Sequence, residues 1–367
     1  MIGLNDDRIV MTLDAGGTNF VFSAIGGNRE IVTPVTLPSN GTDLNACLDT
    51  LIKGFGEIKK SLPRPPVAIS FAFPGPADYP NGIIGDLANI PAFRGGVALG
   101  PMLQDAFGIP VYINNDGDLF TYGEAIGGLL PWVNEQLAKA GSPKRYHNLF
   151  GVTLGTGFGA GIVRKGELFA GDNSNAGEIW LLRNKTKNRC FAEEGVSIRA
   201  IRRVYLENAR NKPSSELTPK DIYAIATGKK DGDKQAALKA FSEMAEVTGD
   251  ALANAITLID GVIVVGGGLA GAWPVMAETL IREMNGTIET VDGKKTARLV
   301  QRVFDGEDAG QLQEFLTGSK KEIKVPRSGK TIQYDPLKRI VIGLSRLGTS
   351  KAVSLGAYAF ALNETDK

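Results

Sequence analysis

Short glycine-rich segments that follow apolar runs are the residues of this chain whose types could handle a phosphate group. The first is Asp14-Ala15-Gly16-Gly17-Thr18, between apolar runs at 9–13 and 20–25 that predict two strands. Glycines lack a Cβ, so backbone N–H groups can approach a phosphate oxygen closely, and the Thr18 hydroxyl can add a donor. Asp14, at the end of the strand, could hold a hydrated Mg²⁺. The competing interpretation is a plain hairpin turn.

A second glycine loop repeats this layout in the other half of the chain. A strand is predicted over 148–154, followed by Gly155-Thr156-Gly157-Phe158-Gly159 and a further apolar strand. Four glycines in the seven residues 155–161 exceed what a turn needs. We interpret the two loops as corresponding parts of two similar halves, forming a clamp across a cleft.

An Asn-Asp cluster, Asn114-Asn115-Asp116-Gly117-Asp118, lies between a predicted strand at 111–113 and a predicted helix at 119–126. Ligands of α/β sheets bind at the carboxyl ends of strands. Asp116 could accept the proton of an attacking hydroxyl group, and Asn115 offers both a donor and an acceptor. The alternative is a helix N-cap, for which we expect Asp118.

The segment Val262–Gly271 matches G-x-G-x-x-G at Gly266, Gly268 and Gly271. Taken literally, this is a dinucleotide fingerprint, so a nicotinamide-dependent oxidoreductase stays open as an alternative. A kinase can use the same geometry to lay adenosine or an α-phosphate against bare backbone. The Walker A pattern G-x-x-x-x-G-K-[ST] does not occur.

Carboxylates and amides gather in the segment 173–179, which includes Glu178, and again at Glu193-Glu194. Such groups accept hydrogen bonds from hydroxyls and therefore suit a polyhydroxylated ligand. The alternative is a solvated polar loop, which we favour for Glu194.

Apolar spacing predicts strands that alternate with helices, and therefore an α/β protein with mixed or parallel sheets covered by helices. The predicted helices span 43–60, 119–126, 197–211, 234–258, 272–284 and 351–362. We expect one domain over 1–128 plus 347–367 and a larger one over 129–346. Two polar stretches, at about 131–146 and 285–337, resemble insertions into the larger domain.

The composition narrows the class of protein. The chain has 367 residues, with 41 Lys plus Arg against 40 Asp plus Glu, and this balance argues against a nucleic-acid binder. Its two cysteines, Cys47 and Cys190, form no CxxC pair, so we expect neither a disulfide framework nor a zinc cage. We find no signal peptide and no apolar stretch of the ~20 residues that a membrane helix needs, and we expect a cytoplasmic protein with no membrane partner.

Taken together, these segments resemble the ROK (repressor, open reading frame, kinase) family of sugar kinases, along nearly the whole chain and in family order. The matching pieces are Asp14-Ala15-Gly16-Gly17-Thr18, Phe73-Pro74-Gly75-Pro76, Leu87-Ala88-Asn89-Ile90-Pro91, Asn115-Asp116, Gly155-Thr156-Gly157-Phe158-Gly159, Asn175-Ala176-Gly177-Glu178, Gly266-Gly267-Gly268 and Leu355-Gly356-Ala357. The resemblance implies two similar ribonuclease H-like domains of the actin/hexokinase type with a cleft between them. It also implies ATP-dependent phosphorylation of a hexose hydroxyl, with glucose or a close relative as the substrate, and it suggests a homodimer.

The resemblance further implies a role for each matching residue. Asp116 would be the general base, and Asp14 would organise Mg²⁺ through water. The sugar hydroxyls would be held by Asn89, Asn115, Glu178 and Glu193. The transferred phosphate would be surrounded by Gly16, Gly17, Thr18, Gly155, Thr156 and Gly157. Gly267 and Gly268 would lie near the nucleotide.

One departure from the family pattern bears on the substrate. Many members follow the residue matching Glu178 with Gly-His and a cysteine-rich zinc motif, whereas this chain has Ile179-Trp180 and only Cys190 nearby. We therefore expect no structural zinc. The missing histidine motivates two alternatives, a catalytically weak or inactive sugar sensor on the same fold, and a kinase for fructose or an N-acetylhexosamine.

Overall fold

The computed structural model describes residues 6–87, 90–211 and 215–367, and these divide into two units. The first unit contains residues 1–128, 161–177 and 347–367, and the second contains 129–160 and 178–346. Residues 161–177, which the sequence analysis placed in the larger domain, therefore lie with the first unit. In the part of the chain that is described, none of the helices combines the length and the apolar character needed to cross a bilayer.

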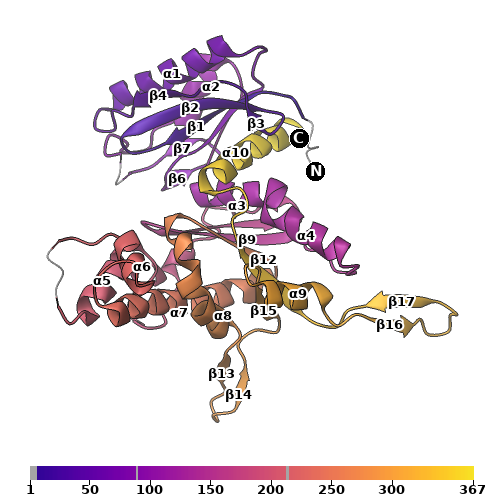
Figure 1. Ribbon diagram of the computed structural model, residues 1–367. Helices are drawn as coiled ribbons and strands as arrows, with labels where there is room; N and C mark the ends of the chain where they lie inside the picture. The colour runs from indigo at the N-terminus through magenta and orange to yellow at the C-terminus, as the bar shows by residue number, and fades with distance from the viewer. Residues whose placement is uncertain (1–5, 88–89, 212–214) are drawn as a thin grey trace. The chain divides into compact units, whose positions relative to one another are not determined.

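The first unit is built on a twisted sheet in the order β3-β2-β1-β5-β8, with β4 pairing to β2 (Figure 1). Strands β1 and β2 are antiparallel, whereas β1 with β5 and β5 with β8 are parallel. The strands are β1 (Val10–Ala15), β2 (Asn19–Gly26), β3 (Arg29–Glu30), β4 (Val35–Pro38), β5 (Ala68–Ala72) and β8 (Val111–Asn114). A small separate hairpin consists of β6 (Ala77–Asp78) and β7 (Ile83–Ile84).

Helices cover both faces of this sheet because successive residues of each strand point to opposite sides. Met11 and Leu13 of β1 belong to the core beneath helices α1 (Leu44–Ser61) and α2 (Leu99–Phe107). Val10 belongs instead to the core beneath α10 (Thr349–Thr365). The larger core is rich in phenylalanines that meet edge to face, such as Phe22 and Phe55 with ring centroids 5.1 Å apart.

Helix α10 packs closely against α3 (Asp116–Gly127) because glycines stand where the two backbones cross. A Cβ at Gly123 would collide with the carbonyl oxygen of Ala352, and one at Gly356 would collide with that of Leu119. The end of the chain therefore lies beside the helix that follows the Asn-Asp pair.

The second sheet has the order β11-β10-β9-β12-β18-β15, and the boundary between the units falls within β10. β9, β12, β18 and β15 are parallel neighbours in that order. The strands are β9 (Asn148–Leu154), β10 (Phe158–Arg164), β11 (Glu167–Leu168), β12 (Val262–Gly266), β15 (Arg302–Asp305) and β18 (Arg339–Leu344). The α-helices of the second unit are α4 (Leu129–Lys139), α5 (Ile198–Asn208), α6 (Pro219–Ala226), α7 (Lys234–Ile259), α8 (Trp273–Met284) and α9 (Ala309–Thr317).

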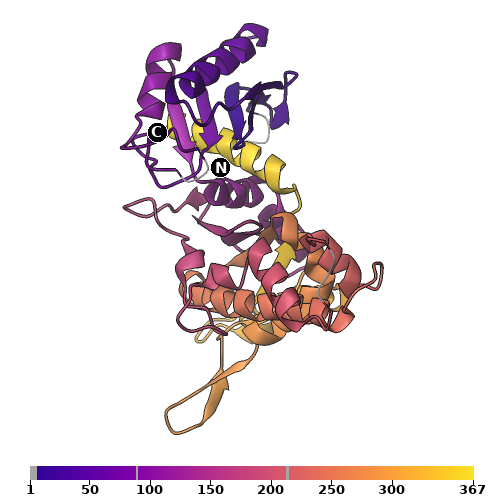
Figure 2. The same cartoon turned by 90° about the vertical axis from the view of Figure 1, so that its left-hand side faces the viewer.

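Two hairpins project from the second unit within the range 285–337 that resembled an insertion (Figure 1), and the first of them is also seen in Figure 2. They are formed by β13 (Thr287–Glu289) with β14 (Lys295–Ala297) and by β16 (Lys321–Lys324) with β17 (Thr331–Tyr334). Strand β15, in the same range, pairs with β18 in the central sheet. A buried ion pair between Arg339 and Asp335, 2.6 Å apart, anchors the base of the second hairpin.

Candidate active site

The first glycine loop is the turn between β1 and β2. Ala15 pairs with Phe20, so the chain reverses within residues 16–19. A Cβ at Gly16 would lie 2.8 Å from the carbonyl oxygen of Asn19, which makes this position a glycine for steric reasons. Buried Ser39 fixes the loop from behind, since its hydroxyl donates to the Gly17 carbonyl at 2.6 Å and its N–H donates to the Thr18 carbonyl at 2.9 Å. Asp14 and Thr18 remain exposed.

Asn115 and Asp116 lie where β8 passes into α3. The Asn115 side chain accepts from the Gly117 N–H at 2.8 Å and is the N-cap of the helix. The prediction that Asp118 is the cap was therefore wrong: the helix begins three residues earlier than predicted, and Asp118 is buried in its first turn. Asp116 is the first helical residue, and its Oδ1 also accepts from the Gly117 N–H, at 2.9 Å.

The protein around Asp116 changes its acidity. Desolvation by this surrounding protein raises the pKa of Asp116 above its ordinary value of 3.8, while the N–H groups of Gly117 and of Asp116 itself act in the opposite direction. Water still reaches the carboxylate, because the residue is exposed. A carboxylate with a raised pKa is a stronger base than a free aspartate, which suits the removal of a proton from a hydroxyl group.

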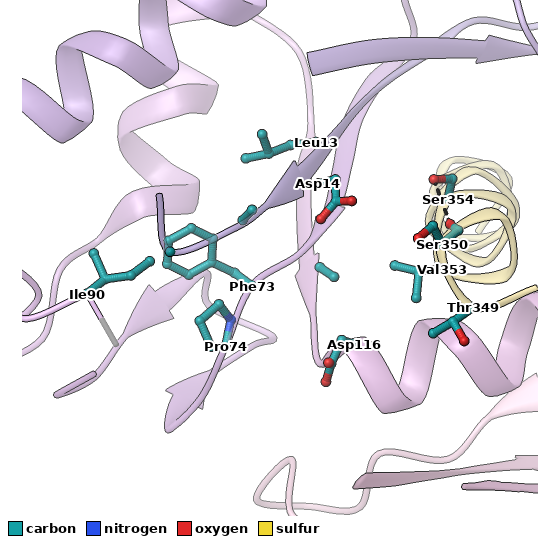
Figure 3. Close-up of a pocket in the computed structure, with 13 residues that line it drawn as sticks. Leu13, Asp14, Phe73, Pro74, Ile90, Asp116, Thr349, Ser350, Val353 and Ser354 are labelled. Atoms are coloured by element: carbon teal, nitrogen blue, oxygen red, sulfur yellow. Dashed lines mark hydrogen bonds between the residues drawn. The ribbon is translucent and has the colours of Figure 1, made fainter. Parts of the chain in front are cut away.

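Asp14, Gly17 and Asp116 line one cavity of about 290 Å³ in the first unit (Figure 3). The two carboxylates come from different elements, Asp14 from the end of β1 and Asp116 from the start of α3. The other lining residues are Leu13, Ala15, Ala72, Phe73, Pro74, Ile90, Thr349, Ser350, Val353 and Ser354. The structure thus brings together the predicted base, the predicted Mg²⁺ ligand and part of the predicted phosphate loop.

Sequence reasoning missed the hydroxyl groups on the wall that α10 provides. Thr349, Ser350 and Ser354 all line the cavity, and the Ser354 hydroxyl donates to the Ser350 carbonyl at 3.0 Å. The available signal was a run of hydroxyl residues at the start of the last predicted helix. That helix is far from Asp14 along the chain, so its place beside the loop becomes visible only in the fold.

The second glycine loop joins β9 to β10 in the second unit. The Gly155 N–H donates to the Gly157 carbonyl at 3.0 Å, which closes the turn, and Thr156 at its tip is exposed. The Ile198 N–H, at the start of α5, donates to the Gly155 carbonyl at 3.0 Å. The Phe158 N–H donates to Oε2 of Glu193, also at 3.0 Å.

The third glycine segment follows β12, a strand that is buried throughout. Gly267 has φ +86°, and a Cβ there would collide with the backbone of Leu154, so no other residue fits this position. Beside Gly268 a Cβ would meet nothing within 4 Å, so this glycine leaves open space at the end of the strand. The parallel pairing of β12 with β9 therefore places this segment next to the strand that carries the second loop.

The model of the ROK family matches residues 10–312 of this chain. The chain belongs to the ROK family. This confirms the family that the sequence motifs predicted, and most of the loops described above fall inside the matched range.

The chain is also similar to individual glucokinases over most of its length. The solved structure of a glucokinase from Parabacteroides distasonis ATCC 8503 is 54% identical, covers 99% of each chain and superposes with a TM-score of 0.92. A glucokinase of Halalkalibacterium halodurans is 28% identical over 328 residues, which is 82% of this chain and 89% of that protein. The predicted α/β fold of the actin/hexokinase type is confirmed.

A more distant ROK member shares the fold at low sequence identity. It is a glucokinase from Streptomyces griseus, solved in complex with glucose and AMPPNP. It is 17% identical, covers 96% of this chain and 98% of its own, and has a TM-score of 0.58.

The predicted sugar-binding residues are distributed over both units. Asn115 lies in the first unit, whereas Glu178 and Glu193 lie in the second. Asn89 lies outside the described residues. Asn115 is engaged as the cap of α3, and its Nδ2 also lies 3.5 Å from the Tyr79 hydroxyl.

The segment that departs from the ROK pattern after Glu178 has aromatic and hydrogen-bonded support. Trp180 donates its indole N–H to Oε2 of Glu178, and its ring meets Phe191 edge to face with centroids 5.5 Å apart. Asn184 is fully buried and accepts from the N–H groups of Thr186 and Lys187, each at 3.0 Å. These contacts tie residues 178–191 together, and they fix one oxygen of Glu178.

Oxygen ligands around the cavity of the first unit fit a hydrated Mg²⁺. Among the residues that the structure describes, no group of three or more His, Cys, Asp or Glu could hold a metal ion. Mg²⁺ keeps several waters and uses one or two carboxylates together with substrate phosphates. Asp14 beside the hydroxyls of Ser350 and Ser354 matches that donor set.

Proposed function

We propose that this protein transfers the γ-phosphoryl group of ATP to a hydroxyl group of a hexose, glucose or a close relative, with Asp116 as the general base. The observation that carries the proposal is the single cavity lined by Asp116, Asp14 and Gly17. It holds a candidate base, a candidate metal ligand and a glycine loop suited to phosphate, which together are the parts that phosphoryl transfer requires.

The enzyme class is confirmed by the relatives. Two of them are glucokinases, and one of these is 54% identical over 99% of both chains. The protein is therefore a sugar kinase, as predicted. The identity of the sugar and the roles of single residues are what we propose.

In the proposed reaction the hexose hydroxyl oxygen attacks the γ-phosphorus of ATP. The bond between this phosphorus and the β–γ bridging oxygen breaks, and ADP leaves with that oxygen. The hydroxyl proton passes to the Asp116 carboxylate, whose raised pKa favours its capture, and is released later to solvent. The products are a hexose phosphate, ADP and one proton.

The glycine loops would position the phosphate groups. Backbone N–H groups around Gly16, Gly17 and Thr18 would stabilise the charge of the transferred group, and those of Gly155, Thr156 and Gly157 would do so from the second unit. Gly267 and Gly268 would lie against the nucleotide. Asp14 would hold Mg²⁺ through water, and the ion supplies charge neutralisation when it is bound.

Asn89, Asn115, Glu178 and Glu193 would hold the sugar hydroxyls. The contacts of Glu178 support its part in this, since Trp180 orients the carboxylate through one oxygen and the second oxygen can accept from a hydroxyl. Each oxygen of Glu193 has one partner within the protein and keeps a second acceptor site for a hydroxyl. The homodimer and the cytoplasmic location stay predictions.

The proposal is tested by incubating the protein with ATP, Mg²⁺ and single sugars, and measuring ADP. The panel contains glucose, mannose, fructose, N-acetylglucosamine and N-acetylmannosamine, with a sugar-free reaction as the control. We expect ADP to form fastest with glucose or its close relative. ADP formation at the sugar-free rate with every member of the panel would contradict a hexose kinase.

The same panel tests the alternative of a sugar sensor, which the Ile179-Trp180 sequence favours because a family histidine is missing there. A sensor would be stabilised thermally by a sugar without making ADP. Stabilisation together with ADP would exclude it.

A further inference from the structure

The projecting hairpin β16–β17 has one apolar face and one polar face. We call residues 319–335, which contain it, the arm. Ile323 lies opposite Ile332 and Lys321 lies opposite Tyr334, so these four side chains share one face of the ribbon. The other face is polar and is formed by Glu322, Lys324, Thr331 and Gln333. The arm is therefore amphipathic, like a strand pair that packs on something with its apolar side.

The apolar face of the arm is exposed. Ile332 is 52% exposed and Tyr334 is 42% exposed, and the arm extends away from α9 and the central sheet of the second unit (Figure 1). A two-stranded hairpin by itself is at best marginally stable in water, and it becomes stable when an apolar face is packed. Exposed apolar side chains that gather on a projecting element mark an interaction surface.

The base of the arm is held rigidly. The Ser319 N–H donates to Oδ1 of Asp335 at 3.2 Å, which ties the two ends of the arm together. Arg339 donates from Nη1 to Oδ2 of Asp335 and from Nε to the Phe315 carbonyl, each at 2.6 Å. The arm is thus fixed in direction before any partner arrives, which lowers the entropy cost of binding.

A second exposed apolar surface lies at the same edge of the sheet. Leu258 is 87% exposed and Val300 is 86% exposed. Leu258 precedes β12 and Val300 precedes β15, while the arm precedes β18, the strand between them. Nε2 of Gln301 donates to Oδ1 of Asp260 at 2.7 Å, which brings Val300 near the end of α7. We call Leu258, Asp260 and Val300 the edge surface.

The charges of the arm and of the edge surface are complementary. The arm has one glutamate and five basic residues, which are Lys320, Lys321, Lys324, Arg327 and Lys330. Since the whole chain has a net charge of only +1, the chain outside the arm is negative. Two arms repel each other, whereas the exposed Asp260 gives the edge surface a negative charge beside its apolar side chains.

We propose that the arm of one chain packs on the edge surface of a second copy of this chain, and that the two copies exchange arms in a symmetric dimer. Arm and edge surface lie at one edge of the sheet, so a two-fold axis there forms both contacts at once. Ile332 and Tyr334 then cover Leu258 and Val300, and the lysines of the arm lie near Asp260.

The experiment measures the dimer Kd of the full chain by sedimentation velocity over a range of concentrations. We expect the wild type to have twice the chain mass. Ile332→Asp in the arm and Leu258→Asp in the edge surface should each raise the dimer Kd by about a hundredfold or more, because each buries an unpaired charge at both symmetric contacts. Both residues are exposed in the single chain, so the melting temperature should report intact folding.

Leu206→Asp is the matched control. Leu206 is 48% exposed and lies on α5 of the same unit, outside both surfaces. Its dimer Kd should equal that of the wild type.

Mixing the two interface variants tests the exchange of arms itself. Each variant alone has two broken contacts per dimer. A mixed dimer keeps one intact contact, between the arm of Leu258→Asp and the edge surface of Ile332→Asp. The mixture should therefore form dimers at concentrations where either variant alone is monomeric.

Several results would overturn the proposal. These are a monomeric wild type, a wild-type Kd in either interface variant, an effect of Leu206→Asp as large as that of Ile332→Asp, or a mixture that stays monomeric. A monomeric wild type that sediments with vesicles containing phosphatidylglycerol, and loses this binding in Ile332→Asp, would assign the arm to an anionic membrane surface instead. Binding of duplex DNA with the same dependence on the arm would assign it to nucleic acid.

Discussion

The two glycine loops follow the same plan in sequence and are held in place by different chemistry. The first is secured through its carbonyl oxygens by a neutral residue, since both bonds come from Ser39. The second is secured partly through an N–H group by the charged Glu193, with Arg199 behind it. The two similar halves therefore share the glycine turns but not the side chains that hold these turns in place.

The carboxylates next to the two loops also differ in their exposure and in their contacts. Asp14 directly precedes the first loop and lines a cavity together with Asp116, and both carboxylates are exposed. Leu154 precedes the second loop, and the carboxylate that contacts this loop is engaged by the protein. Exposed carboxylates thus lie beside the glycine loop of the first unit, whereas the carboxylate beside the loop of the second unit is bound to its backbone.

The largest effect in this comparison should come from Asp116→Asn. The amide cannot accept a proton, so kcat should fall by about 10²–10⁴-fold, the usual contribution of a general base. The sugar Kd should change little, because the amide keeps the size of the carboxylate and one acceptor oxygen. The melting temperature should stay the same or rise, because the raised pKa of Asp116 means that its negative charge costs folding stability at neutral pH. Steady-state ADP release, calorimetry and thermal melting measure the three quantities.

Asp105→Asn is the control for this prediction, since Asp105 is an exposed aspartate of α2. Its kcat should equal that of the wild type. Equal turnover in Asp116→Asn and Asp105→Asn would refute the assignment of the base.

A smaller effect is expected when equivalent glycines of the two loops are replaced by alanine, and its size should differ between the loops. A Cβ at Gly16 meets the Asn19 carbonyl at 2.8 Å, so Gly16→Ala must shift the turn, whereas Gly155 has open space. A displacement of about 1 Å near reacting groups can cost ~10²-fold in rate. We therefore expect kcat/KM for ATP to fall by about ten- to hundredfold in Gly16→Ala, and by clearly less in Gly155→Ala. A larger loss in Gly155→Ala than in Gly16→Ala would contradict the steric difference between the two loops.

The elements that carry the site could be predicted from the sequence where an apolar run ends at a glycine or an Asn-Asp pair. The strand predicted over 262–265 is β12 (Val262–Gly266), and the one predicted over 148–154 is β9. A short apolar run between turn residues is typical of a strand that is buried on both faces, and this pattern can be recognised from neighbouring residues alone. The place of Asp116 after a strand and before a helix was visible for the same reason.

The contacts that complete the site join residues far apart in the chain, and spacing alone cannot reveal them. Glu193 and Phe158 are 35 positions apart. Ser350 and Ser354 reach the cavity of Asp14 only because glycines allow α10 to pack tightly on α3. The prediction that Asp118 caps α3 was wrong because Asn and Asp cap helices about equally well, and four of them stand within residues 114–118.

The central claim is that the ionised Asp116 carboxylate removes the proton of the hexose, and the pH dependence of kcat/KM for the sugar tests it most directly. The rate should fall as the pH drops through the pKa of Asp116 in the free enzyme, which lies above the ordinary aspartate value because of desolvation. In Asp116→Asn the residual rate should lose this acidic limb. An unchanged acidic limb in Asp116→Asn would show that another group removes the proton.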